Sequence, residues 1–274
     1  MTQTSPDPQH SVLQRLEDYF DAVPRSSCDV EDIGGFTLFV ARSGWPYYAR
    51  PRRGASETSA DDVRRVLERQ QDLGVPRKFE WIDEVSPQVM QAVTEAGLEV
   101  ERMPLLTLVG DPVGSDAAAR MLTPDDTETI ALARAAVSLG FQHGGTASGP
   151  AGVAERDSLA ADPAETGLTS LLERMAAGRI WMGAVWAPGE EQVGPVGGGS
   201  YAPVGGVAEI AGVAVLPAYR RRGLAAQLTC ALARHALSNG MTTVFCSAQS
   251  AAVARVYEGV GFRRVGTACA AELT

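Results

Sequence analysis

Apolar residues recur with two different periods along the chain, and their alternation predicts a mixed α/β protein. A spacing of three and four residues indicates an amphipathic helix at about 11–23. The same spacing predicts further helices at 59–73, 86–97, 124–139, 164–177, 223–238 and 250–259. Short apolar runs predict strands at 36–42, 45–51, 78–83, 100–109, 179–187, 193–204, 207–217, 242–248 and 263–273, and residues 142–154 are a glycine-rich loop.

The order of these elements indicates two domains. Small and turn-forming residues around 111–118 predict a linker between an N-terminal domain, 1–110, and a second domain, 119–274. Both halves carry an arginine-glycine turn followed by helix, strand, helix and strand, which indicates a weak internal repeat. The alternative is that this order recurs by chance, as it does in many α/β proteins.

Composition narrows the classes of function. The 24 basic and 33 acidic residues give a formal charge of −9, which argues against nucleic-acid binding. The four cysteines form neither a CxxC nor a CxxH pattern, so we expect reduced thiols, no metal site and a cytoplasmic protein. The first ten residues, MTQTSPDPQH, have neither the basic nor the apolar region of a signal peptide, so we expect none, and no apolar run approaches the roughly 20 residues of a membrane span.

The segment AVLPAYRRRGLAAQL, residues 214–228, carries the strongest chemical signal. An apolar strand leads to Arg220, Arg221 and Arg222, and Gly223 opens the next helix. The first backbone N–H groups of a helix lack partners, and the helix dipole adds positive charge there, so this turn suits a phosphate. The alternative to a phosphate site is that these arginines form a solvated basic start of the helix. Neither a GxGxxG nor a Walker motif is present.

Two motifs in order resemble the signatures of the GCN5-related N-acetyltransferase (GNAT) superfamily. Arg220-x-x-Gly223-x-Ala225 matches its pyrophosphate loop, [QR]-x-x-G-x-[GA]. Residues 250–262, SAAVARVYEGVGF, resemble its second signature, with Tyr257 in register. Ser250 stands where asparagine is usual, which leaves its role as a cofactor ligand open. The resemblance covers about 120–274, and the N-terminal half resembles at most a degenerate second copy.

The resemblance implies a GNAT-like acyl-CoA N-acyltransferase fold and acetyl-CoA as acyl donor. The pantetheine arm would lie beside the backbone of Val213, Ala214 and Val215, with a backbone N–H near Val215 stabilising the oxyanion. The pyrophosphate would bind the three arginines and the backbone of Gly223, Leu224, Ala225 and Ala226.

Two residues are candidates for proton transfer. Tyr257 would protonate the leaving thiolate, and its alternative role is to pack the helix on the sheet. Glu209 would take a proton from the amine. It stands six residues before Val215, a spacing similar to that of the general-base glutamate in the histone-acetyltransferase branch. The alternative is that Glu209 is an exposed residue at the end of the strand. Strand alternation predicts that Glu209, Ala211, Val213 and Val215 share one face.

These features predict direct acetyl transfer to a primary amine of a small molecule or peptide. Two alternatives are a non-catalytic acyl-CoA-binding regulator and an aminoacyl or peptidyl transferase on the same fold. We expect no metal, nucleic-acid or membrane partner, and either a monomer or a homodimer.

Overall fold

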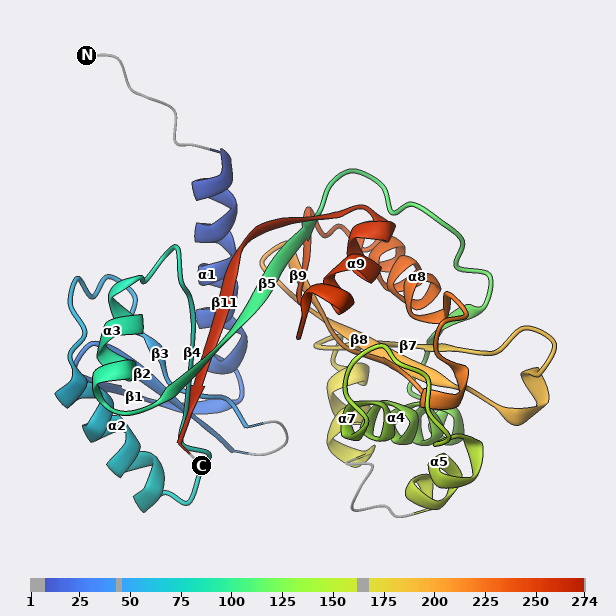
Figure 1. Cartoon of the computed structure of the whole chain (residues 1–274), viewed down its shortest axis with the longest axis horizontal. Coiled ribbons are helices and arrows are strands. Elements are labelled where there is room, and N and C mark those ends of the chain that lie inside the picture. The colour runs from blue at the N-terminus through green and yellow to red at the C-terminus, as the bar shows by residue number, and fades with distance from the viewer. Residues whose placement is uncertain (1–7, 43–45, 162–167, 274) are drawn as a thin grey trace. The chain divides into compact units, whose positions relative to one another are not determined.

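Figure 1 shows the computed structural model of the chain, which describes residues 8–42, 46–161 and 168–273. Its contacts divide the chain into two compact units: the first is Met1–Leu105 with Val265–Thr274, and the second is Leu106–Arg264. The last residues, which the sequence alone assigns to the second domain, thus group with the first unit. No helix of the described chain has the length and apolar character to cross a bilayer.

The first unit begins with a long helix and contains a small antiparallel sheet. In chain order its elements are α1 (Pro8–Arg25), β1 (Cys28–Ile33), β2 (Phe36–Ala41), β3 (Arg50–Pro51), α2 (Ala60–Asp72), β4 (Lys78–Ile82), α3 (Gln88–Glu95) and most of β5 (Glu99–Leu108). β2 pairs with both β1 and β3, and Lys78–Ile82 pairs with the end of β11 (Phe262–Glu272). Phe36, Phe79 and Trp81 are central to its core.

Two predictions for the first unit were wrong in detail. The strand expected at 45–51 is reduced to Arg50–Pro51, and residue 45 lies outside the described part of the chain. β1 was not predicted, because its sequence CDVEDI places acids and an exposed valine where a half-buried strand normally alternates. Its hydrogen bonds to β2 hold it as a strand despite this weak pattern.

The second unit is a mixed sheet with helices packed against it. Its elements are β6 (Ala119–Leu122), α4 (Thr127–Gln142), α5 (Val153–Ala160), α7 (Leu168–Ala176), β7 (Trp181–Val185), η1 (Glu191–Val193), β8 (Gly197–Val204), β9 (Val207–Val215), η2 (Pro217–Tyr219), α8 (Leu224–Ser238), β10 (Thr243–Ser247), α9 (Ala251–Val260) and the start of β11. β6 to β9 form an antiparallel run, and β10 joins β9 in parallel. From β6 to β10, the strands of this unit have the order β10-β9-β8-β7-β6.

Three predictions for the second unit need correction. The helix expected at 124 begins at Thr127, because the Asp126 carboxylate accepts bonds from the backbone N–H and hydroxyl of Thr123 and closes a turn there. β6 directly follows the expected linker and was not predicted as a strand, and α5 begins inside the segment expected to be a loop. Of the helix expected at 164–177, residues 164–167 lie outside the described residues and Leu168–Ala176 are helical.

The order of elements is similar in the two units. In the first, α1 is followed by β1, β2 and β3, and then by α2, β4, α3 and β5. In the second, α4 and the shorter α5 and α7 precede β7, β8 and β9, and α8, β10, α9 and β11 follow. The arginine-glycine turns at Arg53-Gly54 and Arg222-Gly223 thus occupy equivalent places, and both glycines have positive φ.

Candidate active site

A bulge in β9 sets the direction of the side chains at the centre of the second unit. Gly198 pairs with Ala214 and Ser200 with Ala211, so Gly212 and Val213 together oppose the single residue Gly199. Gly212 has φ +67°, a left-handed conformation that favours glycine.

The bulge reverses the alternation of side chains along β9. Glu209 and Ala211 therefore lie on one face of the sheet with Ala214, while Val213 and Val215 lie on the other. The expectation that Glu209, Ala211, Val213 and Val215 share one face was wrong, because one additional residue in a strand turns every later side chain to the opposite face.

β9 and β10 separate at the middle of the sheet. They pair in parallel at only three positions, with Phe245 opposite Glu209 as the last. Beyond this point Ile210–Val215 and Cys246–Ser247 are not paired with each other. The separation leaves backbone groups on one edge of β9 available to an extended ligand, and Glu209 lies where it begins.

The two proposed catalytic residues lie at this separation. Cys246 follows the last paired residue of β10, and the Glu209 carboxylate contributes, after burial, to raising the pKa of its thiol. Burial and, to a lesser extent, Cys246 raise the pKa of the Tyr257 phenol well above its usual range. The structure thus brings Glu209, Cys246 and Tyr257 into one electrostatic environment, in which the thiol is kept protonated and unreactive.

Tyr257 is a buried residue with a free hydroxyl. Its ring packs on Phe262 with the centroids 5.9 Å apart. Within the described residues its hydroxyl has no hydrogen-bond partner, yet that oxygen is not fully enclosed by protein atoms. A buried phenol normally finds a partner, so this hydroxyl is available to a ligand atom at the separation of the strands.

The backbone between β9 and α8 forms an open turn. Arg221 has φ +66° and is the one non-glycine residue with positive φ among the described residues, and Gly223 has φ +76°. Gly223 is the N-cap of α8, and neither a capping side chain nor an acidic residue occupies the first turn. A backbone that alternates left-handed residues with a residue of another conformation can turn successive N–H groups into one concavity, which suits an anion.

The equivalent helix of the first unit is closed by its own residues. Ser59 caps α2 by accepting a hydrogen bond from the Asp62 N–H, and the Asp62 carboxylate accepts bonds from the N–H groups of Ser59 and Gly35. Asp61 adds a second acid to the first turn. A phosphate is therefore unfavourable at α2, and the two equivalent helix starts differ in their capacity to hold an anion.

The three arginines of the turn have different surroundings. The Arg220 guanidinium binds backbone carbonyls of the chain itself. Arg222 pairs with Glu190 at 2.7 Å and lies over the Tyr219 ring, and the Tyr219 hydroxyl also donates to Glu190. Arg221 makes no such contact within the described chain. No local pattern in the sequence indicated Glu190, whose position depends on the loop between β7 and β8.

Ser250 acts as a helix cap. Its hydroxyl oxygen accepts a hydrogen bond from the Val253 N–H at 3.3 Å and begins α9, the helix that carries Tyr257. This contact gives Ser250 a structural task, and its hydroxyl proton remains available to a second partner.

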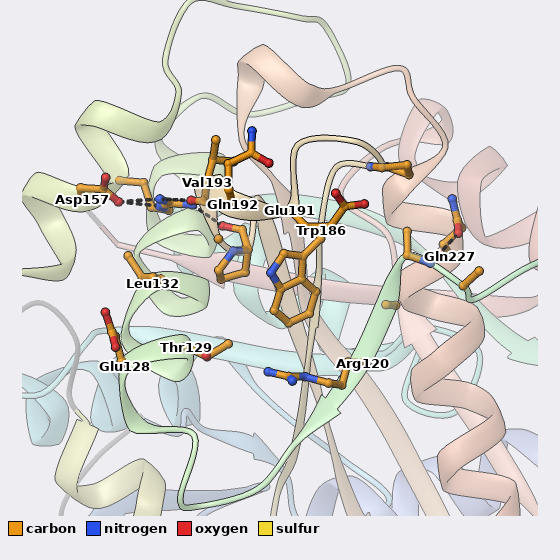
Figure 2. A pocket seen from close by; sticks show the side chains of 17 residues that line it. Arg120, Glu128, Thr129, Leu132, Asp157, Trp186, Glu191, Gln192, Val193 and Gln227 are labelled. Atoms are coloured by element: carbon orange, nitrogen blue, oxygen red, sulfur yellow. Dashed lines mark hydrogen bonds and ion pairs between the residues drawn. The ribbon is translucent and has the colours of Figure 1, made fainter.

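A separate cavity of about 860 Å³ lies beside β6 and α4 (Figure 2). Arg120 lies over the Trp186 ring at its edge, and Gln227 from α8 also lines it. Neither Glu209, Tyr257 nor residues 220–226 line this cavity, so it is distinct from the separation of β9 and β10. Among the described residues no group of three or more His, Cys, Asp or Glu side chains could hold a metal ion.

Comparison with known families now assigns the second unit. Residues 153–262 match the profile of the "Acetyltransferase (GNAT) family". The chain contains a GNAT-family domain. The matched segment includes β9, the turn at 220–223, α8, β10 and α9, and therefore every candidate residue described above. Proteins of the GNAT family are acyltransferases, which supports an enzyme. A search of the curated proteins finds no match.

Solved structures extend the likeness in fold to nearly the whole chain. A GCN5-related N-acetyltransferase from Kribbella flavida is 18% identical with a TM-score of 0.68, and the match covers 95% of each chain. One from Sphaerobacter thermophilus is 16% identical with a TM-score of 0.55, over 95% of this chain and 84% of the other. A tandem GNAT protein from the clavulanic acid biosynthesis pathway is 13% identical with a TM-score of 0.52, over 86% and 78%.

Proposed function

We propose that the protein is an N-acetyltransferase that moves the acetyl group of acetyl-CoA to a primary amine in a ternary complex. The observation that carries this proposal is the open N-terminus of α8 next to the separated strands β9 and β10, with Glu209 and Tyr257 at the point of separation. The acceptor is the amine of a small molecule or peptide. The second unit performs the reaction, and the first is a degenerate copy that binds no CoA.

The residues present fit acetyl-CoA. Arg221, Arg222 and the N–H groups of residues 221–226 would hold the pyrophosphate, because no acidic residue lies in the first turn of α8. The unpaired edge of β9 at Val213–Val215 would bind the pantetheine arm by backbone hydrogen bonds. When bound, acetyl-CoA supplies the thioester carbonyl that the amine attacks.

Glu209 and Tyr257 divide the proton transfers. A primary alkylamine titrates near 10.4, so near neutral pH it needs a base such as Glu209 to lose its proton. The leaving thiolate needs an acid. Burial raises the pKa of Tyr257 above its ordinary value of about 10, so the phenol keeps its proton throughout the neutral and mildly alkaline range.

Calorimetry tests whether the second unit alone binds acetyl-CoA. We expect one acetyl-CoA to bind per chain, because the α2 helix start is capped by Ser59 and Asp62 whereas the α8 start is open. The Arg222→Glu variant should lose this binding. Two equivalents per chain, or one that survives this substitution, would contradict the assignment to the second unit.

Substitution of Glu190 tests whether Arg222 contacts the pyrophosphate of acetyl-CoA. Its carboxylate holds Arg222 in the free protein, so a bound phosphate would compete with it. Glu190→Gln should strengthen acetyl-CoA binding by about two- to five-fold, the range expected for an exposed ion pair. Glu191→Gln is the matched control, since its carboxylate bonds the Gly189 N–H instead. Equal affinities in both variants and the parent would show that Arg222 does not contact the ligand.

A further inference from the structure

The Arg220 side chain joins three segments of the second unit. Its Nε donates to the Val215 carbonyl at 3.1 Å, at the end of β9. Its Nη2 donates to the Gly140 carbonyl at 2.7 Å, in the last turn of α4. Its Nη1 donates to the carbonyls of His143 and Ala147, at 2.7 and 3.1 Å, in the glycine-rich loop. One guanidinium thus makes four hydrogen bonds to the backbone.

These carbonyls are groups that require a partner. The last four carbonyls of an α-helix have no acceptor role within the helix, and Gly140 belongs to the final turn of α4. Arginine near a helix C-terminus satisfies such carbonyls and interacts favourably with the negative end of the dipole. Here the arginine comes from a position 80 residues later in the chain.

The residues around Gly140 hold α4 and the following loop close to the end of β9. A Cβ at Gly140 would lie 2.8 Å from the Ala214 Cβ, so α4 approaches β9 as closely as its backbone permits. Two backbone bonds fix the loop further along, from the Gly149 N–H to the Pro217 carbonyl and from the Ala218 N–H to the Ala151 carbonyl. The loop at 143–151 therefore lies against the end of β9 and η2.

The backbone N–H of Arg220 also has a partner within the protein, since it donates a hydrogen bond to the Pro217 carbonyl. The guanidinium is partly buried and has no carboxylate partner among the described residues, and burial lowers its pKa. Its charge is balanced by carbonyl dipoles. To reach a phosphate it would have to break bonds to three segments at once, whereas Arg221 and Arg222 lie in the same turn without that cost.

We propose that Arg220 is a positioning residue that clamps the glycine-rich loop over the end of β9, and that the phosphate contacts of the turn belong to Arg221 and Arg222. On the proposed function, which this inference deepens, the loop then forms the acceptor side of the site. Arg220, the first arginine of the motif, would link the proposed pyrophosphate-binding turn between β9 and α8 to the loop at 143–151, because it follows η2 directly and precedes that turn.

The test compares Arg220→Gln, Arg220→Lys and Arg222→Gln in the full chain. Hydrogen exchange of the amides at 144–149 reports the loop, and calorimetric titration with acetyl-CoA at two salt concentrations reports the phosphate site. Both Arg220 variants should speed loop exchange by about ten-fold or more, since an ammonium cannot span the four carbonyls. Arg220→Lys should keep the salt dependence of acetyl-CoA binding.

Arg222→Gln should do the reverse, with loop exchange unchanged and binding weaker and less dependent on salt. The proposal is overturned if Arg220→Gln leaves loop exchange unchanged, or if it removes the salt dependence and Arg220→Lys restores it. A parent protein that binds no acetyl-CoA would refute the proposed function, while the exchange measurement would still decide whether Arg220 clamps the loop. Thermal unfolding of each variant verifies that it is folded.

Discussion

Acetyl-CoA should no longer stabilise the protein against thermal unfolding when Arg222 is replaced by Glu and Gly223 by Pro. Glutamate reverses the charge beside the proposed pyrophosphate. Proline cannot adopt the φ of +76° that Gly223 has, since its ring fixes φ near −65°. A ligand at 100 times its dissociation constant stabilises a protein by about 2.7 kcal/mol, so the lost shift is readily measured by scanning calorimetry.

The first unit offers a matched control for this double variant. Arg53 and Gly54 occupy the equivalent turn, and Gly54 also has a positive φ, of +77°. Arg53→Glu with Gly54→Pro should leave the stabilisation by acetyl-CoA intact, although it removes the ion pair between Arg53 and Asp18. If the first-unit pair abolished the shift and the Arg222 and Gly223 pair did not, the cofactor turn would be assigned to the wrong unit.

Tyr257→Phe should lower kcat by about 10²- to 10⁴-fold, the range typical for loss of one acid or base, with little change in acetyl-CoA affinity. The substitution keeps the ring on Phe262 and removes a hydroxyl that has no partner within the described chain. Tyr201→Phe is the control: Tyr201 is as deeply buried, and burial raises its pKa to about 12, but its hydroxyl bonds His235. It should change stability and leave kcat near the parent value.

The pH dependence separates the acid from the base. The raised pKa of Tyr257 means that the phenol stays protonated as pH rises through about 10, so the parent should lose no activity there through this group. The defect of Glu209→Gln should shrink with rising pH, because the solution then deprotonates the amine. A pH-independent defect in Glu209→Gln would make Glu209 a structural or binding residue. An unchanged kcat in Tyr257→Phe would assign protonation of the thiolate to water.

The motifs around Gly223 and Tyr257 were sufficient to predict the fold class, because they resemble the two GNAT signatures and occur in the same order. The spacing of apolar residues likewise located α2 correctly, since the helix expected at 59–73 spans Ala60–Asp72 with Ser59 as its N-cap. The direction of the β9 side chains could not be predicted from alternation alone. Gly212 within the strand was the available signal of a bulge, since an interior glycine often marks one.

Other features depend on residues distant in sequence. Arg220 resembles a phosphate ligand in the motif, but its partners at 140, 143 and 147 become neighbours only when α4 packs on β9. Glu190 comes to Arg222 through the β7–β8 loop. Neither contact has a local pattern in the chain, so tertiary structure was needed to distinguish the roles of three adjacent arginines.

Thiol release from acetyl-CoA in the presence of a panel of primary amines tests the central claim most directly. The panel should contain polyamines, amino sugars, amino acids and peptides with free N-termini or lysine. We predict that at least one class accelerates thiol release by about 10²-fold or more over the amine-free reaction, and that the Arg222→Glu, Gly223→Pro variant abolishes the acceleration. Acetyl-CoA binding at the α8 turn with thiol release unchanged by every amine would contradict the account and indicate a non-catalytic acyl-CoA-binding protein.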